Sequence, residues 1–221
     1  MWSTKSVITK PSVETLANIQ QALNDDGSLN MNIWATYIGQ QYLPLAFLYA
    51  QQAASAAKIS PKLIYNDYNL ENNGPKTASA RLIVQYIQQW GIKIDGVGFE
   101  SHFLVGQTPD LPTQMAAMQQ ITSLGPSIYQ TELDVRFSSL PPTTGGLAQQ
   151  AEDYYTTISA CMQTPLCAGM TVWDFSDKYS WIPASFPGQG DATPYWANYT
   201  RKPAYTAIYQ AIEGVNCTVC T

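Results

Sequence analysis

The segment Ser127-Ile-Tyr-Gln-Thr-Glu-Leu-Asp134 decides the fold class, because it is a short strand-forming run between two helical patterns. Apolar residues recur every three or four positions over 113–124 and 147–161, which predicts two amphipathic helices. Strands that alternate with helices indicate a parallel sheet with right-handed crossovers. The alternation continues along the chain, with strands expected at 63–65, 94–99, 127–133 and 170–173, and further helices at 32–57 (kinked at Pro44), 77–90 and 203–212.

Every predicted strand ends in polar or aromatic residues. These ends read Asn66-Asp-Tyr-Asn69, Glu100-Ser-His102, Thr131-Glu-Leu-Asp134 and Trp173-Asp174. In a (β/α)8 barrel such positions form the active face. A doubly wound sheet would also satisfy the alternation, but no glycine-rich phosphate loop follows any strand, which counts against its dinucleotide-binding version.

Composition narrows the class of partner. The chain has 221 residues, of which 45% are hydrophobic and 12% charged, so it is globular rather than disordered. Its net charge is -5 and its Lys and Arg residues are few, which argues against a nucleic-acid partner. No run has membrane-spanning length. An acidic, charge-poor chain with 6 Trp and 14 Tyr fits a neutral polymer such as a polysaccharide.

The four cysteines form two local pairs. The short spacer between Cys161 and Cys167 predicts a disulfide. Cys217 and Cys220 could form a strained disulfide or remain two free thiols. One isolated Cys-x-x-Cys and a single His argue against a zinc site, so we expect no metal and no other cofactor.

Two features point to an extracellular protein. The triplets Asn198-Tyr-Thr200 and Asn216-Cys-Thr218 are glycosylation sequons, and the cysteine pairs suit an oxidising compartment. The first ten residues do not form a secretory signal. A truncated chain would account for this combination.

Glu132 is the best candidate for a catalytic carboxylate. Glycosidic cleavage with retention needs two carboxyl groups about 5–5.5 Å apart, one of which attacks the sugar carbon. His102, at the end of the preceding strand, could hold Glu132 ionised while Asp134 sets the imidazole tautomer. The alternative is that Glu-Leu-Asp is only a solvated strand end.

These segments together resemble glycoside hydrolase family 10, the endo-1,4-β-xylanases, in their fungal form. Residues 62–71 are similar to the fifth strand of that family, 95–102 to the sixth, 131–134 to the nucleophile strand, and 171–181, 187–191 and 202–205 to the eighth strand and the segment after it. The resemblance runs from about Ala22 to Ile212. It implies a partial TIM barrel, from strand 4 or 5 to strand 8, as one domain at 28–213 between an atypical segment at 1–27 and a tail at 214–221.

The resemblance also implies roles for individual residues. Glu132 would be the nucleophile, supported by His102 and Asp134, and the substrate would be xylan or xylo-oligosaccharides. The pairing of Cys161 with Cys167 resembles a disulfide of the fungal members. Asn66 and Tyr68 would contact sugar hydroxyl groups. Trp173 and Trp181 would pack against the sugar at the bond that is cleaved. Core packing is the alternative for these two Trp residues, and we assign Trp34, Trp90 and Trp196 to packing.

Three departures from the family pattern bear on activity. Gln21 stands at the acid/base position, and an amide has no proton to transfer. The first strand-helix units have no counterpart here, which would leave sheet edges open to self-association. Glu100 replaces an expected Gln. It is either a nearly isosteric change, or a sugar-binding residue coupled to Glu132 such that one carboxyl stays protonated.

The N-terminal pattern predicts a helix at 12–23, with Val13, Leu16, Ile19 and Leu23 on its apolar face and Gln21 facing water. Three functions therefore remain open. They are an endo-xylanase with impaired catalysis, a non-catalytic binder of xylan, and an inactive truncated fragment.

Overall fold

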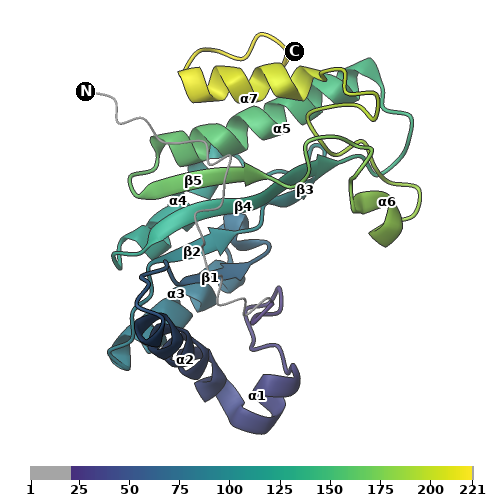
Figure 1. Cartoon of the computed structure of the whole chain (residues 1–221). Coiled ribbons are helices and arrows are strands. Elements are labelled where there is room, and N and C mark those ends of the chain that lie inside the picture. The colour runs from purple at the N-terminus through teal and green to yellow at the C-terminus, as the bar shows by residue number, and fades with distance from the viewer. Residues whose placement is uncertain (1–20, 221) are drawn as a thin grey trace.

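The computed structural model describes residues 21–220 (Figure 1). It contains a five-stranded sheet, in which every strand pair is parallel. The strands are β1 (Ile64–Asp67), β2 (Gly96–Phe99), β3 (His102–Leu104), β4 (Ser127–Arg136) and β5 (Cys167–Val172). The expected parallel α/β architecture is confirmed, as part of a barrel.

The long strand β4 organises the sheet. Its first residues pair with β2, in register Gly96↔Ser127 to Phe99↔Gln130, and its other edge pairs with β5. The end of β4 pairs with β3, with His102 opposite Asp134. Strand β3 thus continues β2 after a break at Ser101, whose φ of 62° lies in the left-handed region. The sequence pattern did not predict this second strand, which sets His102 directly beside Asp134.

The helices follow the strands in the order that the sequence predicts. Figure 1 shows α2 beyond β1 at one end of the sheet, and α5 with α7 beyond β5 at the other. The helical elements are α1 (Ile33–Ile38), η1 (Gly39–Gln41), α2 (Tyr42–Ala56), η2 (Leu70–Asn72), α3 (Pro75–Gln89), α4 (Leu111–Thr122), α5 (Thr144–Gln163), α6 (Ile182–Ser185) and α7 (Pro203–Glu213). None of the described helices is both long and apolar enough to span a membrane.

The predicted helix at 32–57 is divided in two. The break lies at Gly39, which has a φ of 73°, and not at Pro44. Pro44 falls in the first turn of α2, where a backbone N–H would have no helical partner in any case. A proline there starts a helix without bending it.

The predicted N-terminal helix is wrong where it can be checked. Most of 12–23 lies outside the described residues, but residues 21–23 are not helical. Gln21 has a φ of 57°, and Leu23 forms an antiparallel bridge with Leu29. The Leu23 amide donates to Asp67 Oδ2 at 3.2 Å. This contact with a strand end far along the chain outweighs the local helical periodicity.

Two apolar clusters fill the space between the sheet and its helices. The larger includes Phe47, Tyr65, Ile87 and Met118, and the smaller joins β4 to α5 and α7 around Tyr154. The predicted Cys161–Cys167 disulfide is present and ties the end of α5 to the start of β5. The second pair, Cys217 and Cys220, also forms a disulfide.

Helix α1 is far less well covered than the sheet. Ile33 and Tyr37 are 66% and 83% exposed, and Trp34 is 60% exposed although we expected it to pack. Trp90 is also exposed, whereas Trp196 is half-buried with the Lys202 ammonium 4.6 Å from its ring centroid. The α1 region therefore contributes little to the core.

Candidate active site

The carboxyl ends of β1, β2, β4 and β5 surround a cavity of ≈ 570 Å³. Because parallel strands end at the same edge of a sheet, residues far apart in sequence meet there. Most of the predicted site residues line this cavity, and Asn66 and Asp134 lie behind them. The lining residues are Gln21, Tyr68, Asn69, Glu100, His102, Glu132, Arg136, Trp173, Trp181 and Phe186.

Asn66 holds the two glutamates of the site in place. Its Nδ2 donates to Glu132 Oε1 at 3.0 Å and to Glu100 Oε1 at 3.2 Å. The Asn66 side chain can reach across the sheet because its neighbour on β2 is Gly98. A Cβ at Gly98 would lie 2.0 Å from Asn66 Oδ1, so any other residue would displace the amide. Thr131 Oγ1 completes the arrangement by donating to Asn66 Oδ1 at 2.7 Å.

His102 faces both glutamates from the opposite side. Its Nε2 lies 3.5 Å from Glu132 Oε2 and 3.9 Å from Glu100 Oε2. Its Nδ1 lies 3.0 Å from Asp134 Oδ1, and Trp181 Nε1 donates to Asp134 Oδ2 at 2.8 Å. The imidazole and the indole also meet edge to face, with ring centroids 5.0 Å apart. These contacts set the orientation of the imidazole.

The electrostatics of the site favour the protonated, positively charged form of His102. Burial alone would lower the pKa of His102, but the Asp134 and Glu132 carboxylates that it faces outweigh burial and raise this pKa to about 9. Burial and the charge of Glu132 raise the pKa of Glu100 to about 7. At neutral pH an imidazolium therefore lies between the carboxylates, and Glu100 is partly protonated.

A buried ion pair lies behind Tyr68. Lys76 Nζ is 3.0 Å from Asp67 Oδ1 and 3.2 Å from the centroid of the Tyr68 ring. Tyr65 Oη donates to Asp67 Oδ2 at 2.5 Å, while burial raises the pKa of Asp67. Sequence analysis missed Lys76, because a lysine in the first turn of a helix has no local mark of burial.

Gln21 reaches the cavity from the N-terminal side. It is exposed, as predicted, but the water that it faces is that of the cavity. Asn69, one of the predicted strand-end residues, also lines the cavity, whereas Arg136 and Phe186 were not predicted. Arg136 lies 4.2 Å from the centroid of the Phe186 ring. The period-two alternation of β4 from Glu132 to Arg136 was the available signal for the arginine.

Comparison with known proteins gives a uniform result. The model of the family "Glycosyl hydrolase family 10" matches residues 15–211. The chain is 49% identical over 195 residues to "Endo-1,4-beta-xylanase D" of Talaromyces funiculosus, across 88% of this chain and 47% of that protein. It is 43% identical over 190 residues to "Endo-1,4-beta-xylanase 1" of Humicola insolens, across 86% of this chain and 43% of that protein.

Solved structures agree with the sequence relatives. The Penicillium canescens endo-1,4-beta-xylanase XylE superposes with a TM-score of 0.88 at 46% identity, across 91% of this chain and 61% of that one. A GH10 xylanase from Bispora sp. MEY-1 with xylobiose superposes with a TM-score of 0.84 at 46% identity, across 87% of this chain and 60% of that one. The chain spans about half the length of the curated relatives that it matches.

Proposed function

This chain belongs to glycosyl hydrolase family 10, and from that premise we propose that it carries a retaining endo-1,4-β-xylanase site with an impaired acid/base side. The observation that supports the proposal is the environment of Glu132. Asn66 and His102 contact its two carboxylate oxygens within β4, next to an open cavity. A carboxylate held this way is ready to attack a sugar carbon above it.

His102 and Asp134 act as a unit on the nucleophile. The charge of the imidazolium stabilises ionised Glu132, and Asp134 keeps the ring aimed at it. Trp181 in turn holds the second oxygen of Asp134. The Glu132 nucleophile thus has a partner for each oxygen, and its main partner His102 is itself braced.

The sugar would lie against aromatic walls. Trp173 is partly exposed and Trp181 faces the cavity, so each offers a flat surface to the apolar face of a pyranose. Tyr68 lines the cavity and is suited to sugar hydroxyl groups, as are the carboxyl oxygens of Glu100. The amide of Asn66 is fully buried and hydrogen-bonded to both glutamates, so Asn66 would support the sugar site by positioning them. Xylo-oligosaccharides are the proposed ligands, and two of the structural neighbours were solved with xylobiose.

Gln21 is the weak point of the catalytic proposal. The departing oxygen needs a proton, which an amide cannot supply. Positioned acid–base help is typically worth ~10²–10⁴-fold in rate. Burial and the charge of Glu132 raise the pKa of Glu100 to about 7, so Glu100 is partly protonated at neutral pH, but Asn66 holds it beside Glu132 on the nucleophile side. We therefore expect binding with slow turnover.

A non-catalytic xylan-binding role is the second candidate, and Gln21 is the observation that favours it. An inactive fragment is the third. The exposed α1 favours its self-association, as do β1 and β5, which each pair with one strand only within residues 21–220. We further propose an extracellular location, which the two disulfides support.

The test is calorimetric titration with xylotetraose, combined with a reducing-sugar assay. Trp173→Ala should weaken binding at least tenfold, which corresponds to about 1.4 kcal/mol. Trp90→Ala is the matched control, since Trp90 and Trp173 are both 42% exposed and only Trp173 lines the cavity. Glu132→Gln should keep binding and abolish any hydrolysis.

Two results would count against this function. Equal weakening by Trp173→Ala and Trp90→Ala would show that the cavity is not where the sugar binds. Hydrolysis that survives in Glu132→Gln would remove Glu132 from the role of nucleophile.

A further inference from the structure

Three potential metal ligands converge in the cavity. Glu100, His102 and Glu132 each direct one ligand atom into a space where these atoms all lie within 4.8 Å of one another. His102 Nε2 is 3.5 Å from Glu132 Oε2 and 3.9 Å from Glu100 Oε2. Asn66 holds the Oε1 atoms of both glutamates, which leaves their Oε2 atoms turned toward the imidazole.

These separations suit a tetrahedral ion. Zinc binds imidazole nitrogen and carboxylate oxygen at about 2.0–2.2 Å, so the ligand atoms of a tetrahedral site lie roughly 3.4 Å apart. The two distances from His102 Nε2 are close to that value. The ligand atoms of Glu100 and Glu132 also lie within 4.8 Å of each other.

The groups around the three ligands are also those of a metal site. A metal-bound histidine normally turns its other ring nitrogen to a carboxylate, which orients the ring. Asp134 Oδ1 lies 3.0 Å from His102 Nδ1, and Trp181 braces Asp134 from behind. The chain thus pre-orients both the imidazole and the two carboxylates.

The local charge favours a cation. Glu100 and Glu132 are only 7% and 9% exposed. Within residues 21–220, their one ion-pair partner is His102, and no Lys or Arg nitrogen reaches either carboxylate. Buried charges are normally paired or bound to metal. The cavity opens to solvent, so an ion can enter and keep a water molecule as fourth ligand.

We propose that this cavity binds one divalent transition-metal ion, with Zn²⁺ as the best match, through Glu100, His102 and Glu132. Two carboxylates and one imidazole form a donor set of the kind that zinc and its first-row neighbours accept. Binding replaces the proton on His102 Nε2, which leaves to solvent. The inference goes beyond the proposed hydrolase function, does not rest on it, and revises our sequence-based expectation of no metal. The ion would occupy the oxygen of Glu132 that faces the cavity and so compete with a bound sugar.

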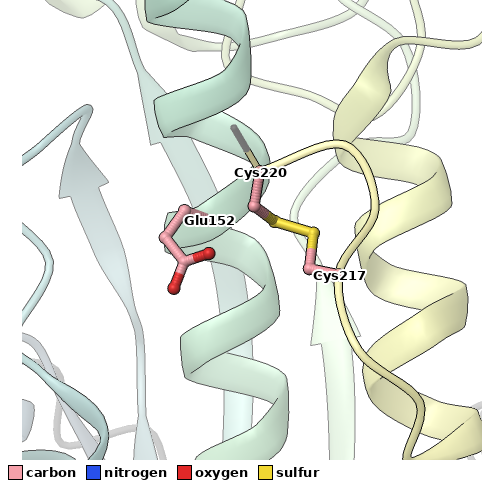
Figure 2. A group of neighbouring side chains, drawn as sticks. All are labelled: Glu152, Cys217 and Cys220. Carbon is pink, nitrogen blue, oxygen red and sulfur yellow. A yellow bond between two sulfur atoms is a disulfide. The ribbon is translucent and has the colours of Figure 1, made fainter.

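A second group with metal-ligand atoms offers an internal control. Figure 2 shows Glu152 on α5 beside Cys217 and Cys220 of the C-terminal segment. The two sulfur atoms are bonded to each other, so neither is the thiolate that binds a metal. We therefore expect no ion there while the disulfide is intact.

The first test is titration of the full, chelator-stripped chain with Zn²⁺ by calorimetry, repeated with Co²⁺ by visible absorption. One ion per chain should bind, and Co²⁺ should show the intense bands of a four-coordinate site. Glu100→Gln should weaken Zn²⁺ binding at least about tenfold, because loss of even an outer hydrogen bond of a metal site costs ~10–100-fold. Glu152→Gln, the matched control, should leave the affinity unchanged. Equal affinity for Zn²⁺ in the Glu100→Gln variant, or loss of binding in Glu152→Gln instead, would overturn the proposal.

The second test needs no variant and so stands even if Glu100→Gln fails to fold. The sequence contains a single histidine, so its imidazole ¹⁵N resonances need no assignment. One equivalent of Zn²⁺ should shift Nε2 of His102 strongly while Nδ1 keeps its proton toward Asp134. Unmoved imidazole resonances at saturating Zn²⁺ would refute the site. Xylotetraose binding by the metal-free chain tests the hydrolase function separately.

Discussion

The two sides of the cavity differ in how completely they are built. On the β4 side, Glu132 has Asn66 on one oxygen and His102 on the other, and all three are largely withdrawn from solvent. On the other side, Gln21 itself is exposed, and the segment that follows it leads into the poorly covered helix α1. The side-chain partners of Glu132 are Asn66 on β1 and His102 on β3. Strands β1, β3 and β4 therefore suffice to hold both carboxylate oxygens of Glu132.

The largest expected effect is on xylan hydrolysis, through a carboxylic acid introduced at position 21. Gln21→Glu should raise xylan hydrolysis by ~10²–10⁴-fold, because a carboxylic acid can protonate the leaving oxygen and then activate water. The measurement is reducing-sugar release at fixed enzyme concentration. Gln119→Glu makes the same change in charge on α4, in a different groove, and should leave the rate unaltered.

A folded Gln21→Glu variant without increased hydrolysis would mean that this position does not meet the leaving group. The two sides of the cavity would then differ in geometry and not only in one side chain.

The next effect concerns stability. Ile128→Ala removes a fully buried side chain of β4 and should lower the free energy of unfolding by about 2–5 kcal/mol. Ile33→Ala makes the same change at a side chain that is 66% exposed on α1, and should cost no more than about 0.5 kcal/mol. Urea unfolding of both variants at equal protein concentration measures the difference.

A large loss in Ile33→Ala would contradict this contrast. If the stability that Ile33→Ala loses grows with protein concentration, a second copy of the chain covers α1 in solution, which would support self-association.

The smallest expected effect is a change in how steeply the free energy of unfolding varies with pH. Glu71 is fully buried beside Ser101, whose Oγ donates to Glu71 Oε1 at 2.8 Å, and burial raises the pKa of Glu71 above its ordinary value of 4.5. The folded chain therefore keeps a proton that the unfolded chain has released, so Glu71 lowers stability as pH rises above 4.5. Glu71→Gln should make stability fall less steeply with pH across that range. Thermal unfolding at several pH values measures the slope.

Glu213→Gln on the exposed end of α7 is the control and should not alter the slope. A Glu71→Gln variant with the slope of the unchanged chain would mean that other buried acids, such as Asp67, carry the pH dependence.

Much of the fold was predictable from local patterns. Strands β1, β2, β4 and β5 and helices α3, α4, α5 and α7 were predicted within a few residues, because their apolar periodicity matches the face that each buries. The wrong predictions fall where a contact between residues far apart in the sequence determines the backbone conformation. Leu23 leaves a helical pattern because its amide meets Asp67, and the break at Ser101 creates β3 because β4 is long enough to pair twice.

The sequence by itself was enough to single out Glu132, His102, Asp134 and Gln21 as candidate site residues, because strand-end positions and family motifs are written in local order. Only the tertiary structure decided how they meet. Asn66 reaches Glu132 and Glu100 across Gly98, and Lys76 is buried against Asp67. Such contacts depend on strand register and on the space left by a missing side chain. Both arise from the packing of the whole sheet and not from any one segment.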